Sequence, residues 1–151
     1  MNKIADRYSR IYAQLEPLIS KSPNYIAAMS TICALLSAKM DYFFWCGFYF
    51  VNEKELTVGP YQGSLACQIL SYPHGVCWAS VNQKKTMVIP DVHAFPGHIA
   101  CDSRSQSEIV IPLFDENYSV WAVMDVDSSK KDSFGENDVL WLEKIVQLIV
   151  K

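Results

Sequence analysis

The chain has 151 residues, of which 50% are apolar and 19% are charged. This length buries one complete core and is too short for two ordinary domains, so we expect residues 1–151 to form a single domain. A net charge of -3 offers no basic surface for a run of phosphates, which argues against nucleic acid as a partner and favours a small substrate.

The N-terminal sequence and the apolar runs predict a cytoplasmic protein without a membrane span. Residues 1–6 lack the apolar stretch that begins a secretory signal. The longest apolar run, residues 42–51, has about half the length of a membrane-spanning helix. We therefore expect this run to be a buried strand.

Five cysteines occur in a sequence that carries no export signal. An odd number in this context argues against a framework of structural disulfides and points to thiols that react or bind a metal. The five are Cys33, Cys46, Cys67, Cys77 and Cys101.

Two amphipathic helices are predicted at the N-terminus. Apolar residues at three- and four-residue steps indicate a helix that ends near Lys21. Ser22 and Pro23 have the composition of an N-cap followed by proline in the first helical position, so the second helix should begin there and reach about Met40. The two expected apolar stripes are Ile4, Tyr8, Ile11, Tyr12, Leu15, Leu18 and Ile19, and Ile26, Met29, Ile32, Cys33 and Leu36.

Aromatic and β-branched residues predict a buried strand at residues 42–51, and a polar turn then leads into a short strand at 56–58. The glycines and prolines of residues 59–75 should keep regular structure brief there. The smaller elements expected next are a strand at 67–70, a helix after Gly75, a strand at 86–89 and a long ordered loop at 90–106.

Residues 107–114 and 118–127 are predicted antiparallel strands, and a final helix follows them. Ser133 and Glu136 have the spacing of a capping box for that helix. Its expected apolar stripe is Val139, Leu140, Leu142, Ile145, Val146 and Ile149. The order of elements predicts an α+β domain in which N- and C-terminal helices pack on a central antiparallel sheet.

Strand alternation places Trp45 and Tyr49 on one face of their strand and Cys46 on the other. The same alternation puts Asp125 and Asp127 side by side, about 7 Å apart. Two such carboxylates in a poorly solvated site repel each other, so one should have a raised pKa or both should face a cation such as a substrate ammonium. The alternative is that the pair caps a turn at the exposed end of the sheet.

Cys101 lies in a polar loop between His98 and Arg104, where its thiolate could be favoured for nucleophilic or redox chemistry. The alternative is an inert, partly exposed thiol. Cys33 and Cys46 fall among apolar neighbours and are expected to be buried packing thiols. His74 and His93 are expected to be ordinary loop residues.

Five motifs occur in order along the chain: WCGFYF (45–50), GPYQGSLAC (59–67), GVCWA (75–79), DVHAFPGHIACDSRSQSEIVIPL (91–113) and VMDVDS (123–128). Together they resemble the GAF-domain free methionine-(R)-sulfoxide reductases over nearly the whole chain. The resemblance implies a GAF-like fold and a thiol enzyme that needs no metal or organic cofactor. It also implies that free methionine-(R)-sulfoxide is the substrate and thioredoxin the reductant, and it leaves a homodimer open.

The resemblance further implies a role for eight residues. These are Cys101 as nucleophile, Cys67 as resolving thiol, Cys77 as third family cysteine, Glu108, Asp125 and Asp127 in substrate contact or proton transfer, and Trp45 and Tyr49 as pocket walls. This chain departs from the family pattern at Trp78, where glycine is usual.

Two other functions stay open at this point. A GAF fold often serves as a small-molecule sensor or binding module, in which the cysteines would be incidental. Zinc binding is the second alternative, with a tetrahedral set made of Cys67, Cys77, His98 and Cys101. No close Cys-x2-Cys pair supports that second alternative.

Overall fold

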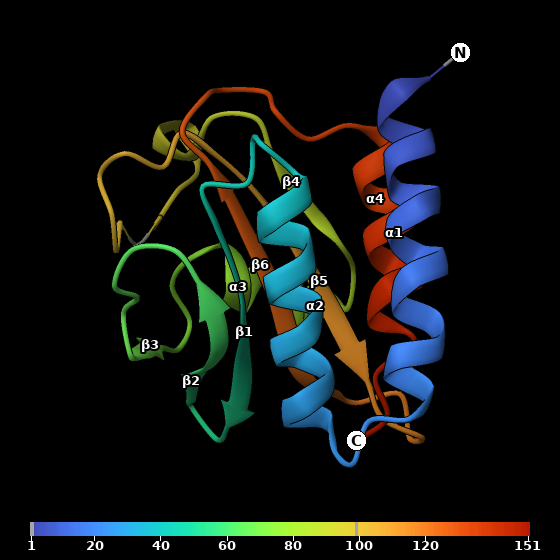
Figure 1. The fold of residues 1–151 in the computed structure, drawn as a ribbon. Coiled ribbons are helices and arrows are strands. Elements are labelled where there is room, and N and C mark those ends of the chain that lie inside the picture. The colour runs from blue at the N-terminus through green and yellow to red at the C-terminus, as the bar shows by residue number, and fades with distance from the viewer. Residues whose placement is uncertain (1, 99) are drawn as a thin grey trace.

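The core of the fold is an antiparallel sheet. Within residues 2–98 and 100–151, which the computed structural model describes, six strands form one sheet in the order β3-β2-β1-β6-β5-β4 (Figure 1). The strands are β1 (Trp45–Asn52), β2 (Glu55–Gln62), β3 (Ile69–Ser71), β4 (Met87–Ile89), β5 (Ser107–Phe114) and β6 (Val120–Ser128). The long central strands β1, β6 and β5 lie next to one another and carry most of the buried side chains of the sheet.

Helices cover both faces of this sheet. They are α1 (Lys3–Ser20), α2 (Tyr25–Lys39), α3 (Val76–Gln83) and α4 (Glu136–Val146), with a single 3-10 turn at Val92–Ala94. Figure 1 shows α1 and α4, at opposite ends of the chain, side by side, whereas α3 lies against β5 and β6. This is the α+β architecture that the sequence predicts. None of the described helices combines the length and apolarity needed to cross a membrane.

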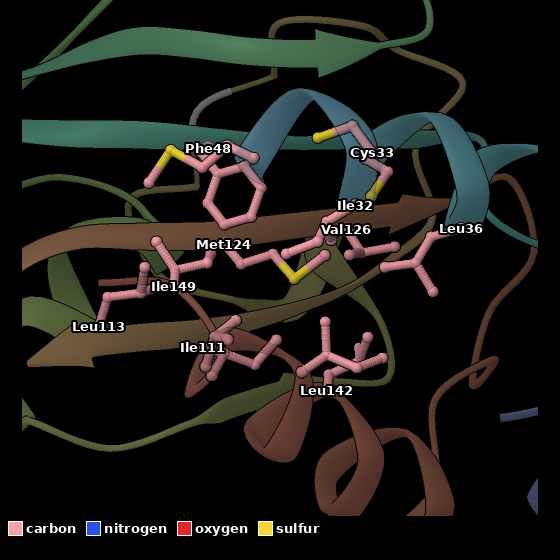
Figure 2. Close-up of a cluster of buried hydrophobic side chains, with 14 of the residues drawn as sticks. Ile32, Cys33, Leu36, Phe48, Ile111, Leu113, Met124, Val126, Leu142 and Ile149 are labelled. Carbon is pink, nitrogen blue, oxygen red and sulfur yellow. The ribbon is translucent and has the colours of Figure 1, made fainter. Parts of the chain in front are cut away.

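The alternation of side chains divides the core into two clusters. Phe48, Met124 and Val126 point toward α1, α2 and α4 and pack with Ile32 and Leu142 (Figure 2). The opposite face of the sheet carries a smaller cluster that α3 covers. Its buried members are Trp45, Tyr49, Leu56, Leu70, Val76, Cys77, Trp78, Val110 and Val123. The predicted assignment of Trp45 and Tyr49 to one face and Cys46 to the other is confirmed.

Strand β2 is longer than the sequence predicts. It continues through Gly59 and Pro60 and pairs with β1 as far as Gln62. The register between the two strands shifts between Gly47 and Tyr49, which leaves one extra residue in β2. A bulge of this kind accommodates proline, because its missing N–H removes no regular ladder hydrogen bond.

Both predicted helix caps are wrong. Helix α2 is capped by Asn24, whose Oδ1 accepts from the Ala27 N–H at 2.9 Å, rather than by Ser22. Helix α4 begins at Glu136, and the Asp138 carboxylate accepts from the Gly135 N–H at 2.8 Å. An Asn or Asp side chain nearer the helix supplies the acceptor in each case, so the preceding serines are not needed.

Three residues predicted to be buried lie at the surface. The exposed fractions are 51% for Leu18, 45% for Ile26 and 55% for Leu140. Leu18 and Ile26 sit at the border of the buried stripe of their helices, whereas Leu140 lies on the side of α4 opposite the buried residues Leu142 and Ile145. The predicted helices are therefore correct, but their apolar faces are narrower than the sequence pattern indicates.

Hydrogen bonds to Asp138 link α4 near the C-terminus to α1 near the N-terminus. Its Oδ1 accepts from the hydroxyl of Tyr8 in α1 at 2.6 Å and from the hydroxyl of Tyr42, which precedes β1. Tyr8 is fully buried and Asp138 nearly so, and the same carboxylate also caps α4. One side chain thus satisfies three donors from three separate segments.

Replacing Asp138 with alanine is expected to lower the free energy of unfolding by about 3 kcal/mol, because two hydroxyls and the Gly135 N–H lose their acceptor. Urea denaturation followed by circular dichroism measures this loss. Asp41→Ala is the matched control, since Asp41 is exposed and its contact with Arg7 at 3.7 Å is a surface ion pair. Equal stability of the two variants would contradict the role assigned to Asp138.

Candidate active site

A pocket opens on the face of the sheet that α3 covers. It encloses about 580 Å³, including the part that is open to solvent. Its walls come from β1, β5, β6, α3 and two connecting segments. The residues that line it are Phe44, Trp45, Tyr49, Ser64, Leu65, Ala66, Leu70, Gly75, Val76, Cys77, His98, Ala100, Cys101, Asp102, Ser105, Glu108, Asp125 and Asp127.

Cys67 and Cys101 form a disulfide at this pocket, with their Cα atoms 5.4 Å apart. Cys67 belongs to the β2–β3 connection and Cys101 to the loop before β5, 34 residues further along the chain. Cys101 is exposed and Cys67 is half-buried. Because Cys101 lines the pocket, the disulfide brings a reactive sulfur to the space that a ligand would occupy.

Three carboxyl groups form the polar part of the pocket. Asp125 and Asp127 project from β6, and Glu108 pairs with Asp127 across the β5–β6 ladder. Glu108 is only 6% exposed and Asp125 only 7%. The two neighbouring aspartates therefore line an enclosed pocket. They do not cap a turn at an exposed end of the sheet, because β6 continues past them to the buried Ser128.

The three carboxyl groups are strongly perturbed. Burial raises the pKa of Glu108 to about 8, and repulsion from Asp127 adds to the effect. Burial also raises the pKa of Asp125, with the charge of Glu108 contributing. Burial raises the pKa of Asp127 as well, and the charge of Asp125 adds to this shift. The pocket therefore favours a cationic ligand, or protonated acids, or both.

Cys77 lies on the pocket floor at the start of α3. It is a buried free thiol, whose sulfur and the nearest oxygens of Glu108 and Asp125 lie within 4.8 Å of one another. Burial raises the pKa of Cys77, and the charges of Asp125 and Glu108 add to the shift. The zinc set considered from the sequence is therefore divided, because Cys67 and Cys101 are bonded to each other while Cys77 contacts carboxylates.

Aromatic rings line the pocket next to the carboxyl groups, since Trp45 pairs with Asp127 across the β1–β6 ladder. Trp45 stacks between Tyr49, at a centroid distance of 6.0 Å, and Tyr61, at 5.2 Å. The Trp45 indole N–H donates to the Ser64 carbonyl at 3.0 Å, and the Tyr49 hydroxyl donates to the Cys67 carbonyl at 2.9 Å. A side chain at Gly47 would place its Cβ 2.5 Å from the Trp45 ring, so this wall requires glycine there.

Polar contacts of Arg104 and His98 hold the loop that carries Cys101. Arg104 donates to both oxygens of Asp102, at 3.0 and 2.7 Å, and lies 4.8 Å from the centroid of the Phe44 ring. His98 Nε2 lies 3.7 Å from Glu108 Oε1, and burial lowers the pKa of this histidine. Arg104 and His98 thus each face a carboxylate.

Sequence reasoning missed Phe44, Ser64 and Asp102 as pocket residues. Asp102 and Arg104 are two positions apart in a polar loop, and this spacing is the signal that could have indicated their ion pair. Phe44 and Ser64 carry no comparable signal, since only the packing of the loop brings them to the pocket. Ile99, part of the HIACD motif, lies outside the described residues.

The side chain of Trp78, where the family pattern usually has glycine, is buried in the smaller core cluster. Its indole N–H donates to the Leu70 carbonyl at 2.9 Å, and its ring meets Tyr72 edge-on at 5.0 Å. The side chain points to β3 rather than into the pocket. The substitution therefore fastens β3 to α3 and leaves the neighbouring Cys77 on the pocket floor.

The chain is similar to known proteins over nearly its whole length. The sequence model of the GAF domain family matches residues 26–150. GAF domain-containing protein A of Dictyostelium discoideum is 42% identical over 145 residues, which cover 95% of this chain and 90% of that protein. The free methionine-R-sulfoxide reductase of Escherichia coli is 34% identical over 151 residues, covering 100% of this chain and 90% of the enzyme.

A solved structure extends this similarity to three dimensions. The X-ray structure of free methionine-R-sulfoxide reductase from Neisseria meningitidis, in complex with its substrate, superposes with a TM-score of 0.93 at 35% identity. The match covers 98% of this chain and 89% of the Neisseria chain. The chain therefore belongs to the GAF-domain family of free methionine-R-sulfoxide reductases.

Proposed function

We propose that this protein is a single GAF domain that reduces free methionine-(R)-sulfoxide to methionine with its own cysteines. The observation that carries the proposal is the Cys67–Cys101 disulfide at a pocket that also contains three buried or half-buried carboxyl groups. A bonded pair of cysteines is the oxidised product of such a reaction. The named activity of the Escherichia coli and Neisseria relatives supports the same assignment.

The proposed chemistry begins with the reduced thiols. The Cys101 sulfur attacks the sulfoxide sulfur, and the oxygen takes up two protons, one given up by the Cys101 thiol and one from a protonated carboxyl group of the pocket. The oxygen leaves as water, and water then attacks the Cys101 sulfur to give a sulfenic acid and free methionine. Cys67 condenses with that sulfenic acid, which forms the disulfide and releases one water overall. The sulfoxide gains the two electrons that the dithiol loses.

Glu108, Asp125 and Asp127 are proposed to bind the substrate ammonium and to supply the proton. Their enclosed position makes an unneutralised charge costly, so an ammonium group that enters the pocket is favoured. A methionine sulfoxide residue inside a peptide lacks that ammonium. The same residues that hold the substrate thus account for a preference for the free amino acid.

The aromatic wall is proposed to contact the reacting end of the substrate. Trp45 and Tyr49 line the pocket and present ring faces to it. A sulfur–aromatic contact with Trp45 would stabilise the sulfoxide side chain, and the apolar wall would exclude water. The buried thiol of Cys77 is assigned an auxiliary role, because its raised pKa keeps it protonated and a poor nucleophile.

Thioredoxin is proposed as the reductant that restores the dithiol. Exchange requires a thiolate to reach one sulfur of the disulfide, and Cys101 is exposed. A cytoplasmic location would supply a reduced dithiol pool continuously.

The cysteine variants separate the two sulfur roles. Cys101→Ser is expected to abolish methionine formation, whereas Cys67→Ser should form about one methionine per protein and then recycle poorly with thioredoxin. Single-turnover assays of the reduced protein with free R- and S-methionine sulfoxide, followed by a thioredoxin-coupled assay, measure both steps.

Cys33→Ala is the matched control, because Cys33 is buried on the opposite face of the sheet and should leave turnover unchanged. Full activity of Cys101→Ser would exclude the mechanism. Reversible binding of methionine sulfoxide by the wild-type protein, without methionine formation, would instead favour a sensor.

The role of the carboxylates predicts a change in substrate preference. Asp125→Asn should lower kcat/KM for free methionine-(R)-sulfoxide by about 10- to 100-fold, the range expected when one charge-assisted contact is lost. The N-acetylated substrate lacks the ammonium, so its already low kcat/KM should change much less. Steady-state kinetics with both substrates measures the difference.

Asp132→Asn serves as the control for this charge change, because Asp132 is exposed and lies outside the pocket. An equal loss for both substrates in Asp125→Asn would mean that this carboxylate does not recognise the ammonium group.

A further inference from the structure

Three potential metal ligands meet on the pocket floor. The Cys77 sulfur and one oxygen each from Glu108 and Asp125 lie within 4.8 Å of one another. They come from α3, β5 and β6, so the fold rather than local sequence brings them together. All three residues are buried, whereas acidic clusters without a ligand are usually solvated at the surface.

Asp125 Oδ1 gives a second, independent indication of a ligand. This atom is buried and has no hydrogen-bond partner among the described residues. Buried acceptors are normally satisfied, and each exception calls for a physical explanation. An ion or a ligand group bound within the pocket would satisfy this oxygen.

We propose that Cys77, Glu108 and Asp125 bind a thiophilic divalent cation such as Zn²⁺ or Cd²⁺, and that the bound cation excludes the substrate. Sulfur, carboxylate and imidazole ligands are those that zinc uses in proteins. Tetrahedral zinc holds such ligand atoms about 3.4–3.7 Å apart, so the three side chains would close by roughly 1 Å. Binding would displace any protons that the ligands carry.

The fourth ligand position is available from the loop that carries Cys101. His98 Nε2 lies 3.7 Å from Glu108 Oε1, so a small rotation would bring the imidazole to the same ion. The proposed site therefore has three ligands from regular elements and one from a loop. It differs from the zinc set considered from the sequence because Cys67 and Cys101 take no part. The ion can therefore bind when these two cysteines are oxidised.

The consequence for catalysis rests on the proposed function. Glu108 and Asp125 would bind either the ammonium group of methionine sulfoxide or the metal ion, but not both. A bound cation would therefore compete with the substrate. Metal binding itself requires neither substrate nor reduction of the disulfide, so it is testable without turnover.

The test uses the full chain with the Cys67–Cys101 disulfide intact and Cd²⁺ as the probe. Titration should give one equivalent of bound metal and the ultraviolet charge-transfer absorbance of a cadmium–thiolate bond. Cys77→Ala should lose the absorbance, and Asp125→Asn should weaken binding at least about tenfold. Cys33→Ala, which also removes a buried thiol, should bind as the wild type does.

Absence of binding to the wild-type protein, or a thiolate signal that persists in Cys77→Ala, would overturn the assignment. Circular dichroism of each variant shows whether it is folded. If Cys77→Ala does not fold, the affinity of Asp125→Asn for Cd²⁺ decides the test. Equal affinity of Asp125→Asn and wild type would also count against the site.

Competition tests the second half of the proposal. In a Cys67→Ser/Cys101→Ser variant, which cannot turn over, free methionine-(R)-sulfoxide should weaken Cd²⁺ binding in proportion to its concentration. Independent binding of the two would overturn the exclusion of substrate. If the wild-type protein fails to reduce methionine sulfoxide while the cadmium titration succeeds, the proposed function is wrong and the metal site is retained.

Discussion

The alternation of side chains along the central strands is the constraint on which the rest of the structure depends. Phe48, Met124 and Val126 must enter the large core, and this requirement sends their neighbours to the other face of the same sheet. Asp125 is one of those neighbours, so a shift of one residue in register would bury a carboxylate among Leu and Ile side chains. The apolar core thereby fixes the position of the pocket's charges.

The pocket concentrates negative charge in a place that water reaches poorly. Glu108 and Asp125 are buried within one ladder, and no lysine or arginine lines the described part of the cavity. Such an arrangement costs folding free energy unless protons or a cation neutralise it. The ammonium of a free amino acid and a divalent metal are two solutions to the same electrostatic problem, which is why the two proposals share residues.

The parts of the molecule that sequence predicts well are those with a fixed period. Two-residue alternation correctly places Trp45 with Tyr49 on one face of their strand and Asp125 with Asp127 on one face of theirs, and helical periodicity locates the helices. The helix caps were missed because Ser22 and Ser133 have the same preferences as the residues that do cap. The pairing of Cys67 with Cys101 is implied by the family resemblance alone, because both cysteines lie in irregular segments where no periodic pattern predicts their positions. The Arg104–Asp102 contact depends on the path of the loop, which no periodic pattern encodes.

The bond between the two sulfurs has a kinetic consequence. In the proposed mechanism the sulfur of Cys101 attacks the substrate as a thiolate, and while it is bonded to Cys67 it is not a thiolate and cannot attack a second sulfoxide. Methionine must therefore depart before the external dithiol can act, and the dithiol must finish before the next substrate reacts. The two reactants alternate at one atom, which is a double-displacement scheme and gives parallel lines in double-reciprocal plots.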